Sequence, residues 1–241
     1  MKKSTKIIIG ILVVLLIIIT ATLGFCIARD LKQEKNLETE IDELLSLMDT
    51  YPLKYEELET RLNRTITTGS YAEVENSVKA YLSSFVNSVK SLDSLFNSEE
   101  IIKAVSAENY KNDGPNFEKT KSNLNVANEE LNKISEDLIS FFTEEKAMSF
   151  IQDKHLDNYY TNLYRDYTVI DSNDTESNSE IANTKKELTN SLNEFKQLIN
   201  KEQEIIDFLS KNKRGWKMED NEIVFYSQSL LDKYNSLIDE I

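Results

Sequence analysis

The sequence predicts an all-α protein in which a single transmembrane helix near the N-terminus precedes an antiparallel helical bundle. A small β-hairpin is predicted near residues 216–226. Three observations support this fold class: an uncharged apolar run at 7–28, apolar residues at helical spacing over most of the remaining chain, and a scarcity of helix breakers. After residue 28 the only glycines and prolines lie between periodic segments, at Gly69, Gly114, Gly215, Pro52 and Pro115.

The apolar run at 7–28 has about the 20 residues that one helix needs to cross a bilayer. A cleaved signal peptide is one alternative, since basic residues precede the run, but signal h-regions are usually only ~7 to 15 residues long. A lipid-attachment box around Cys26 is another, and the bulky Phe25 before that cysteine disfavours it. We interpret the run as an uncleaved signal anchor, which makes the lipid bilayer a predicted partner.

The orientation of this anchor follows less directly, because lysines and arginines flank both of its ends. The segment before the run is short and cationic, and long domains translocate largely regardless of their charge. We therefore expect a single-pass protein of the cell membrane with its N-terminus in the cytoplasm and the bulk of the chain outside. The predicted organisation is a cytoplasmic tail (1–6), a transmembrane anchor (7–28), a helical stalk (29–52) and an extracytoplasmic bundle (53–241).

The charge balance excludes some partners. The chain has 28 Lys and Arg against 42 Asp and Glu, with a formal net charge of −14. A domain this acidic should not bind nucleic acid or anionic lipid through its net field. Its single cysteine, Cys26, lies inside the apolar run, so packing without disulfides must hold the soluble part together.

The elements of the first half are predicted from apolar stripes and capping residues. A stripe in the stalk ends at Pro52, and a short helix around Leu58 follows. After Gly69, the capping box at 70–73 starts a long helix. Ser98 caps another short helix, and 109–116 is predicted to be a loop. The stripes are Leu37, Ile41, Leu44 and Met48 in the stalk, and Val74, Val78, Leu82, Phe85, Val89, Leu92 and Phe96 in the long helix.

In the second half, the most regular stripe in the chain runs from Phe117 to Met148, with interruptions at Thr120 and Glu145, and predicts a helix. A further helical segment with several tyrosines follows Asp153. A polar loop at 171–179 should end in a second capping box, in which Ser177 and Glu180 start another long helix. Residues 216–226 form the hairpin, and a last helix carries Leu230 and Leu237 on one face. Long stripes joined by short loops favour a bundle over the alternative, an extended coiled coil.

The sequence carries no signature of catalysis or of a cofactor. His155 is the single histidine, which excludes any site needing two, and the motifs for phosphate, dinucleotide and zinc binding are missing. We therefore expect no enzyme activity, no cofactor and no metal site. His155 itself is interpreted as a helix-surface residue, and the many carboxylate pairs as a solvated face.

Three weaker features remain as candidates. Glu145 and Glu202 interrupt apolar stripes, and would share a proton or a cation if both faced the core. Tyr160, Tyr164 and Tyr167 share a helix face, and together with Trp216 form the candidate interaction surface, because tyrosine and tryptophan are common at interfaces. The plainer interpretation is that the tyrosines pack along an amphipathic helix and that Trp216 closes the end of the core, under Met218 and Phe225.

The function expected from these observations is that of a membrane-tethered protein-interaction or spacer module in the bacterial cell envelope. Its predicted partner is another envelope protein of unknown identity, with no nucleic acid. The alternative is a ligand-binding sensor domain that holds a small molecule between helices and signals through a partner membrane protein.

Overall fold

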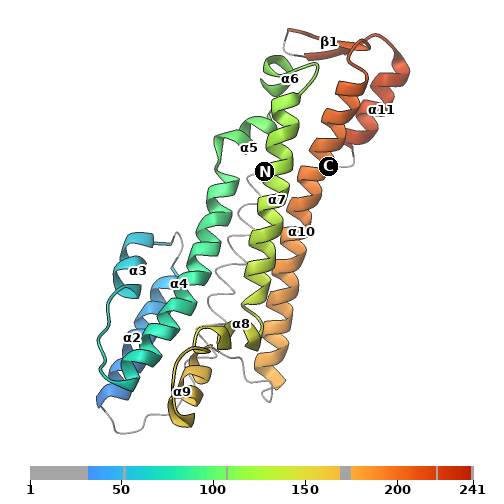
Figure 1. Ribbon diagram of the computed structural model, residues 1–241. Helices are drawn as coiled ribbons and strands as arrows, with labels where there is room; N and C mark the ends of the chain where they lie inside the picture. The colour runs from blue at the N-terminus through green and yellow to red at the C-terminus, as the bar shows by residue number, and fades with distance from the viewer. Residues whose placement is uncertain (1–31, 51–52, 107, 169–174, 221, 240–241) are drawn as a thin grey trace. The chain divides into compact units, whose positions relative to one another are not determined.

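The structure is a computed structural model that describes residues 32–50, 53–106, 108–168, 175–220 and 222–239 (Figure 1). These residues are mostly helical and include one two-stranded antiparallel sheet, which confirms the predicted helical class of the soluble part and the hairpin. The predicted anchor at 7–28 lies outside the described residues. Within the described ranges, no helix is both long and apolar enough to cross a membrane.

The bounds of the elements agree with the predicted segments in most cases. In chain order they are α2 (Lys32–Met48), α3 (Tyr55–Leu62), α4 (Ser70–Phe96), α5 (Glu99–Ala104), α6 (Glu108–Asn112), α7 (Glu118–Ser140), α8 (Glu144–Ser149), α9 (Asn158–Thr168), α10 (Thr175–Lys211), β1 (Trp216–Glu219), β2 (Glu222–Phe225) and α11 (Gln228–Ile238).

The chain divides into two compact units, whereas the sequence predicts one bundle domain. The first unit comprises the residues up to 90 together with 136–191, and the second comprises 91–135 and 192–241. Three long helices, α4, α7 and α10, each contribute one part of their length to each unit.

The core of the first unit includes α2, which was predicted as a stalk. Its apolar residues Leu37, Ile41 and Leu44 are completely buried, as are Val74 and Val78 on α4. An apolar stripe is stable only when another element covers it, and here α2 finds that cover within its own unit. Within the predicted stalk at 29–52, the described helix Lys32–Met48 is therefore part of a core rather than a segment standing apart.

The second unit is closed at one end by the hairpin. In β1 and β2, Trp216 lies opposite Phe225 and Met218 opposite Ile223. Met218 and Phe225 therefore share the face of Trp216, as predicted, and Ile223 joins them. The Trp216 indole is 6% exposed, stacks on Phe117 at 5.8 Å between ring centroids, and donates from Nε1 to the Leu209 carbonyl at 2.8 Å. Trp216 is thus part of the core.

One predicted helix end is confirmed in the structure, and others shift. The Ser98 side chain accepts from the Ile101 N–H, so the predicted cap of α5 is confirmed. Ser70 is already helical, and the carbonyl of Gly69, whose φ is +63°, accepts the first N–H groups of α4 instead. The helix predicted to continue to Met148 ends at Ser140 instead, as α7. The Thr143 side chain then caps a separate helix, α8.

Two loop predictions also change. The predicted loop at 109–116 contains most of the short helix α6, and only its second part is irregular. Helix α10 begins at Thr175, two residues before the predicted cap at Ser177. Residues 171–174 of the predicted polar loop at 171–179 lie outside the described residues.

Candidate functional site

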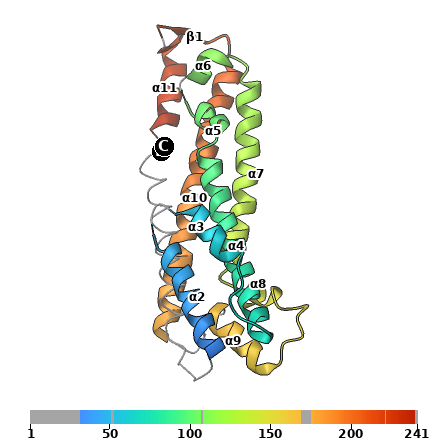
Figure 2. The same cartoon turned by 90° about the vertical axis from the view of Figure 1, so that its left-hand side faces the viewer.

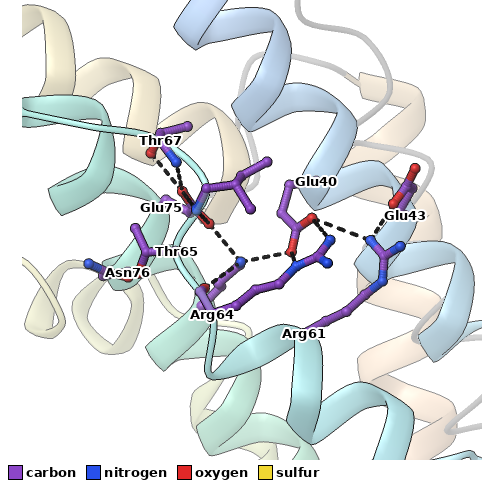
Figure 3. A network of polar contacts seen from close by, with 10 residues as sticks. Glu40, Glu43, Arg61, Arg64, Thr65, Thr67, Glu75 and Asn76 are labelled. Atoms are coloured by element: carbon purple, nitrogen blue, oxygen red, sulfur yellow. Dashed lines mark hydrogen bonds and ion pairs between the residues drawn. The ribbon is translucent and has the colours of Figure 1, made fainter.

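A buried ionic network lies in the first unit, where α2, α3, α4 and the loop at 63–69 meet (Figure 3). Its centre is Lys79 on α4, which is 2% exposed. The Lys79 ammonium donates to Glu40 Oε1 at 2.8 Å, to Glu75 Oε1 at 2.7 Å and to the carbonyl of Arg64 at 2.9 Å. An ammonium has three N–H donors, so all the donors of Lys79 are used.

Glu75 binds the loop that leads into α4. Its carboxylate accepts the backbone N–H groups of Ile66 at 3.1 Å and of Thr67 at 2.8 Å, and the Thr67 hydroxyl at 2.6 Å. The Glu75 side chain is completely buried. Without its bond to Glu75, the buried Thr67 N–H would lack a partner, at a cost of about 1–3 kcal/mol.

Glu40 on α2 binds both arginines of the network. The Arg64 guanidinium donates to both oxygens of Glu40, with a distance of 3.0 Å from Nε to Oε1, and Arg61 donates to Oε2 at 3.3 Å. Arg61 also pairs with the exposed Glu43. Two planar guanidinium groups around one carboxylate fix its orientation, because each donor fork fits only a narrow range of angles.

The network keeps its acidic groups ionised. Burial raises the pKa of Glu40, but hydrogen bonds from Arg64 and Lys79 outweigh this effect and leave the pKa below its ordinary value. For Glu75 as well, burial raises the pKa, and bonds from Lys79 and Thr67 bring it below the ordinary value. The cluster is therefore a set of satisfied ion pairs that fixes the position of α2 on α4.

A second cluster, Tyr71, Tyr159 and Tyr160, lies where the N-terminal ends of α2, α4 and α9 meet in the same unit; we call it the tyrosine cluster. Figures 1 and 2 show α9 beside the start of α2. The Tyr160 ring packs edge-on against Tyr71 and against Tyr159, each at 5.1 Å between centroids.

The hydroxyls of this cluster form a short chain that ends on α2. The Tyr71 and Tyr159 hydroxyls are 3.3 Å apart, and Tyr159 donates to Glu34 Oε2 at 3.1 Å. The bond with Tyr71, burial and the nearby Glu34 carboxylate raise the pKa of Tyr159, so its hydroxyl is neutral. Tyr159 is nevertheless 46% exposed, so part of its ring faces solvent.

The predicted interaction surface of Tyr160, Tyr164, Tyr167 and Trp216 does not form one exposed face. Tyr164 is completely buried and donates to the Ala147 carbonyl at 2.6 Å, and Tyr167 is 5% exposed. Trp216 belongs to the core of the second unit. Tyr160 alone of the four contributes to the tyrosine cluster, where its exposed neighbour Tyr159 joins it.

The two glutamates that interrupt apolar stripes have different surroundings. Glu145 is exposed and belongs to the first unit. Glu202 belongs to the second, where burial raises its pKa to about 6 although the Tyr110 hydroxyl, 3.4 Å away, donates to it. Burial and Glu202 in turn raise the pKa of Tyr110. The proton or cation site that both glutamates would share is therefore not formed in either unit.

The second unit also has an open polar pocket of about 400 Å³. Its walls come from α5, α6 and α7, and the charged residues Glu99, Lys103, Glu108 and Lys119 line it. Glu99 and Lys103 pair with each other at the rim. The Asp113 carboxylate in the wall accepts the Thr120 N–H and hydroxyl, each at 2.7 Å, which fixes the turn before α7.

Within the part of the chain that the structure describes, no group of three or more histidine, cysteine or carboxylate side chains is arranged to hold a metal ion. His155 is exposed, in the segment before α9 rather than on a helix. No protein-family model, curated protein or solved structure matches the chain.

Proposed function

We propose that this chain is a membrane-tethered, extracytoplasmic helical module of the bacterial cell envelope, which binds another envelope protein or spaces it from the membrane. The observation that carries the proposal is the uncharged apolar run at 7–28, followed by an acidic chain with helical patterning. The bilayer is its first partner through this run, and the cell membrane is its location.

The chemistry of the described residues supports a binding or spacing role over catalysis. The charged groups of Glu40, Glu75 and Lys79 are engaged with one another and with the neighbouring loop, so these three side chains serve the fold rather than act on a substrate. The described surface also exposes large apolar and aromatic side chains of the kind found at protein contacts. These are Ile66, Ile102, Val126, Tyr159, Tyr226 and Ile238.

Thiol labelling in intact cells tests the tether and its orientation. Ser94→Cys on α4 would place an exposed thiol in the soluble part, and Cys26→Ser would remove the native one. We expect a membrane-impermeant maleimide to label this full-length variant in intact cells, while a cytoplasmic control protein stays unlabelled. Labelling that appears only after lysis would reverse the orientation, and release of the protein by alkaline carbonate would refute the tether.

Purification in a mild detergent tests the interaction. An envelope protein that copurifies in a fixed ratio, and crosslinks to the chain in intact cells, would support the proposal. A particle that contains the chain alone, from cells grown under several conditions, would argue against a binding role and leave spacing.

The pocket of the second unit is the specific observation that favours the alternative, a ligand-binding sensor. A small molecule bound there would be polar, because glutamates, lysines and asparagines line the walls. Native mass spectrometry of the purified protein would detect such a molecule. For this function, Lys103→Glu and Lys119→Glu should abolish its retention, while Lys133→Glu, an exposed change outside the lining, should not.

A further inference from the structure

The tyrosine cluster is joined to the helix that follows the apolar run most closely in sequence. Tyr159 donates to Glu34 in the first turn of α2, and the Thr68 N–H donates to the neighbouring Gln33 at 3.1 Å. The start of α2, the loop before α4 and the first turn of α9 are thus bonded together. The ionic network fixes the same helix six residues later, through Glu40.

Chain length limits how far this cluster can lie from the end of the apolar run. Six residue steps separate Ala28 from Glu34. Six steps cover about 9 Å in a helix and no more than about 22 Å when fully extended. The polar headgroup region on each side of the hydrocarbon core is itself about 5–7 Å thick. If the run spans a bilayer, Glu34 lies no more than about 22 Å from the end of the run, so the tether lets the cluster reach the headgroup layer.

The chemistry of the cluster matches that layer. Tyrosine is enriched where a membrane meets water, because its ring prefers apolar surroundings and its hydroxyl prefers polar ones. Tyr159 exposes 46% of its surface and keeps a neutral hydroxyl, so it would carry no net charge into the interface. Lys32 and Lys35 on the first turns of α2 are exposed and suit lipid phosphates.

We propose that the tyrosine cluster docks on the headgroup layer of the membrane that holds the anchor, and so sets how the first unit stands on that membrane. This inference rests on the proposed tether. The occupant is the lipid surface rather than a protein, because a connection of only six residue steps holds the cluster close to the membrane, and its exposed tyrosine suits the interface. The contact depends on this tether and not on attraction of charge, since the chain carries a net charge of −14.

Fluorescence quenching in vesicles tests the docking with the full-length chain. Trp216→Phe removes the native tryptophan, and Tyr159→Trp then reports from the cluster. The matched control is Thr50→Trp, which is also exposed and lies just beyond the other end of α2. That helix has 17 residues, or about 25 Å at 1.5 Å per residue. The proteins are reconstituted in phosphatidylcholine vesicles that carry a nitroxide on the lipid headgroup.

We expect at least threefold stronger quenching at position 159 than at position 50, with the same ratio when phosphatidylglycerol is added. Asn158→Trp, on the first turn of α9 and outside the cluster, should repeat the result without altering the tyrosines. In protein that resists carbonate extraction, equal quenching at positions 159 and 50, or weak quenching at positions 158 and 159, would overturn the docking. Protein that carbonate removes would refute the tether itself, and the docking with it.

Discussion

Lys79 on α4 lies 2.8 Å from Glu40 on α2, although 39 residues separate them in sequence. Both side chains are almost completely buried, and Glu75, one turn before Lys79, completes the contact. The amine therefore joins two helices and a loop through a single buried charge. Such a pair stabilises a fold little more than an apolar substitute would, but removing one partner leaves the other charge buried and uncompensated.

We expect Lys79→Met to destabilise the protein by about 3–5 kcal/mol, because Glu40 and Glu75 would then face each other without the ammonium between them. Urea unfolding followed by circular dichroism measures this loss in the full-length chain in mild detergent. Lys90→Met on the same helix is the control, since Lys90 is exposed and pairs with the exposed Glu59. That change should cost less than about 1 kcal/mol. Equal costs for the two variants would show that the network carries no special weight.

The apolar stripes predicted most of the fold, because burial of one helix face leaves a periodic trace in the sequence. They did not predict the break between α7 and α8, where Phe141 is buried and Thr143 turns the chain into a new helix. They also gave no reason to place α2 in a core rather than in a stalk, since a stripe shows that a partner is needed and not where it is.

The ionic network was not predicted from the sequence, for a related reason. Its members are charged, and a search for apolar periodicity treats charged residues as solvated. One signal was present: Glu75 and Lys79 follow the buried Val74 and Val78 at the same four-residue spacing, and so border the core stripe. In a chain with 42 acidic residues that pattern is too common to single out, and the contact to Glu40 is not local.

The candidate tyrosines show that helix periodicity predicts which residues share a helix face, but not whether that face is buried. It correctly placed Tyr160, Tyr164 and Tyr167 on one side of a helix, but the same spacing describes a face turned inward or outward. In α9 that face is turned inward at Tyr164 and Tyr167, and Tyr160 lies in the first turn, where it packs beside the exposed Tyr159. Periodicity did not identify Tyr71 as a partner, because that contact joins residues far apart in sequence.

The cores of the two units offer a direct test of the predicted stripes. Phe85→Asp in the first unit and Leu131→Asp in the second each put a charge where the native side chain is 1% exposed. Each should cost several kcal/mol, enough to unfold a marginally stable domain. Thermal unfolding followed by circular dichroism gives the comparison. The exposed Lys133→Ala on α7 should change stability by no more than about 0.5 kcal/mol, and unchanged melting of the aspartate variants would contradict the assigned cores.

Glu202 should make the protein more stable as the pH falls from about 6 towards 4.5. Its pKa is about 6 in the folded state against an ordinary 4.5, so the folded chain binds the proton more tightly than the unfolded chain. Stability therefore rises as protons are added in this window, by at most about 2 kcal/mol. Urea unfolding at a series of pH values measures the rise. Glu202→Gln, which cannot ionise, should abolish it, and an identical profile in that variant would assign the effect to another group.

Below pH 4.5 the sign reverses, because the pKa values of Glu40 and Glu75 are lowered in the folded state. These groups bind protons more tightly when unfolded, so the stability they contribute is complete above the ordinary pKa and is lost as the pH falls through the folded values. Unfolding curves between pH 5 and 2 should show this loss. Glu75→Gln should flatten the acid limb, whereas Glu145→Gln, an exposed change, should leave it as it is.

Trp216 gives a spectroscopic test of the second unit. Its indole is stacked on Phe117 and its N–H is bonded to the Leu209 carbonyl, so we expect blue-shifted emission that iodide quenches weakly. Trp216→Ala should destabilise the protein by roughly 3–5 kcal/mol, because it leaves a cavity under the hairpin. Trp216→Phe keeps a ring against Phe117 and loses the hydrogen bond, so its cost should be clearly smaller. Red-shifted, readily quenched emission together with a fully stable alanine variant would contradict this. It would mean that the hairpin does not close the core and that Trp216 is exposed.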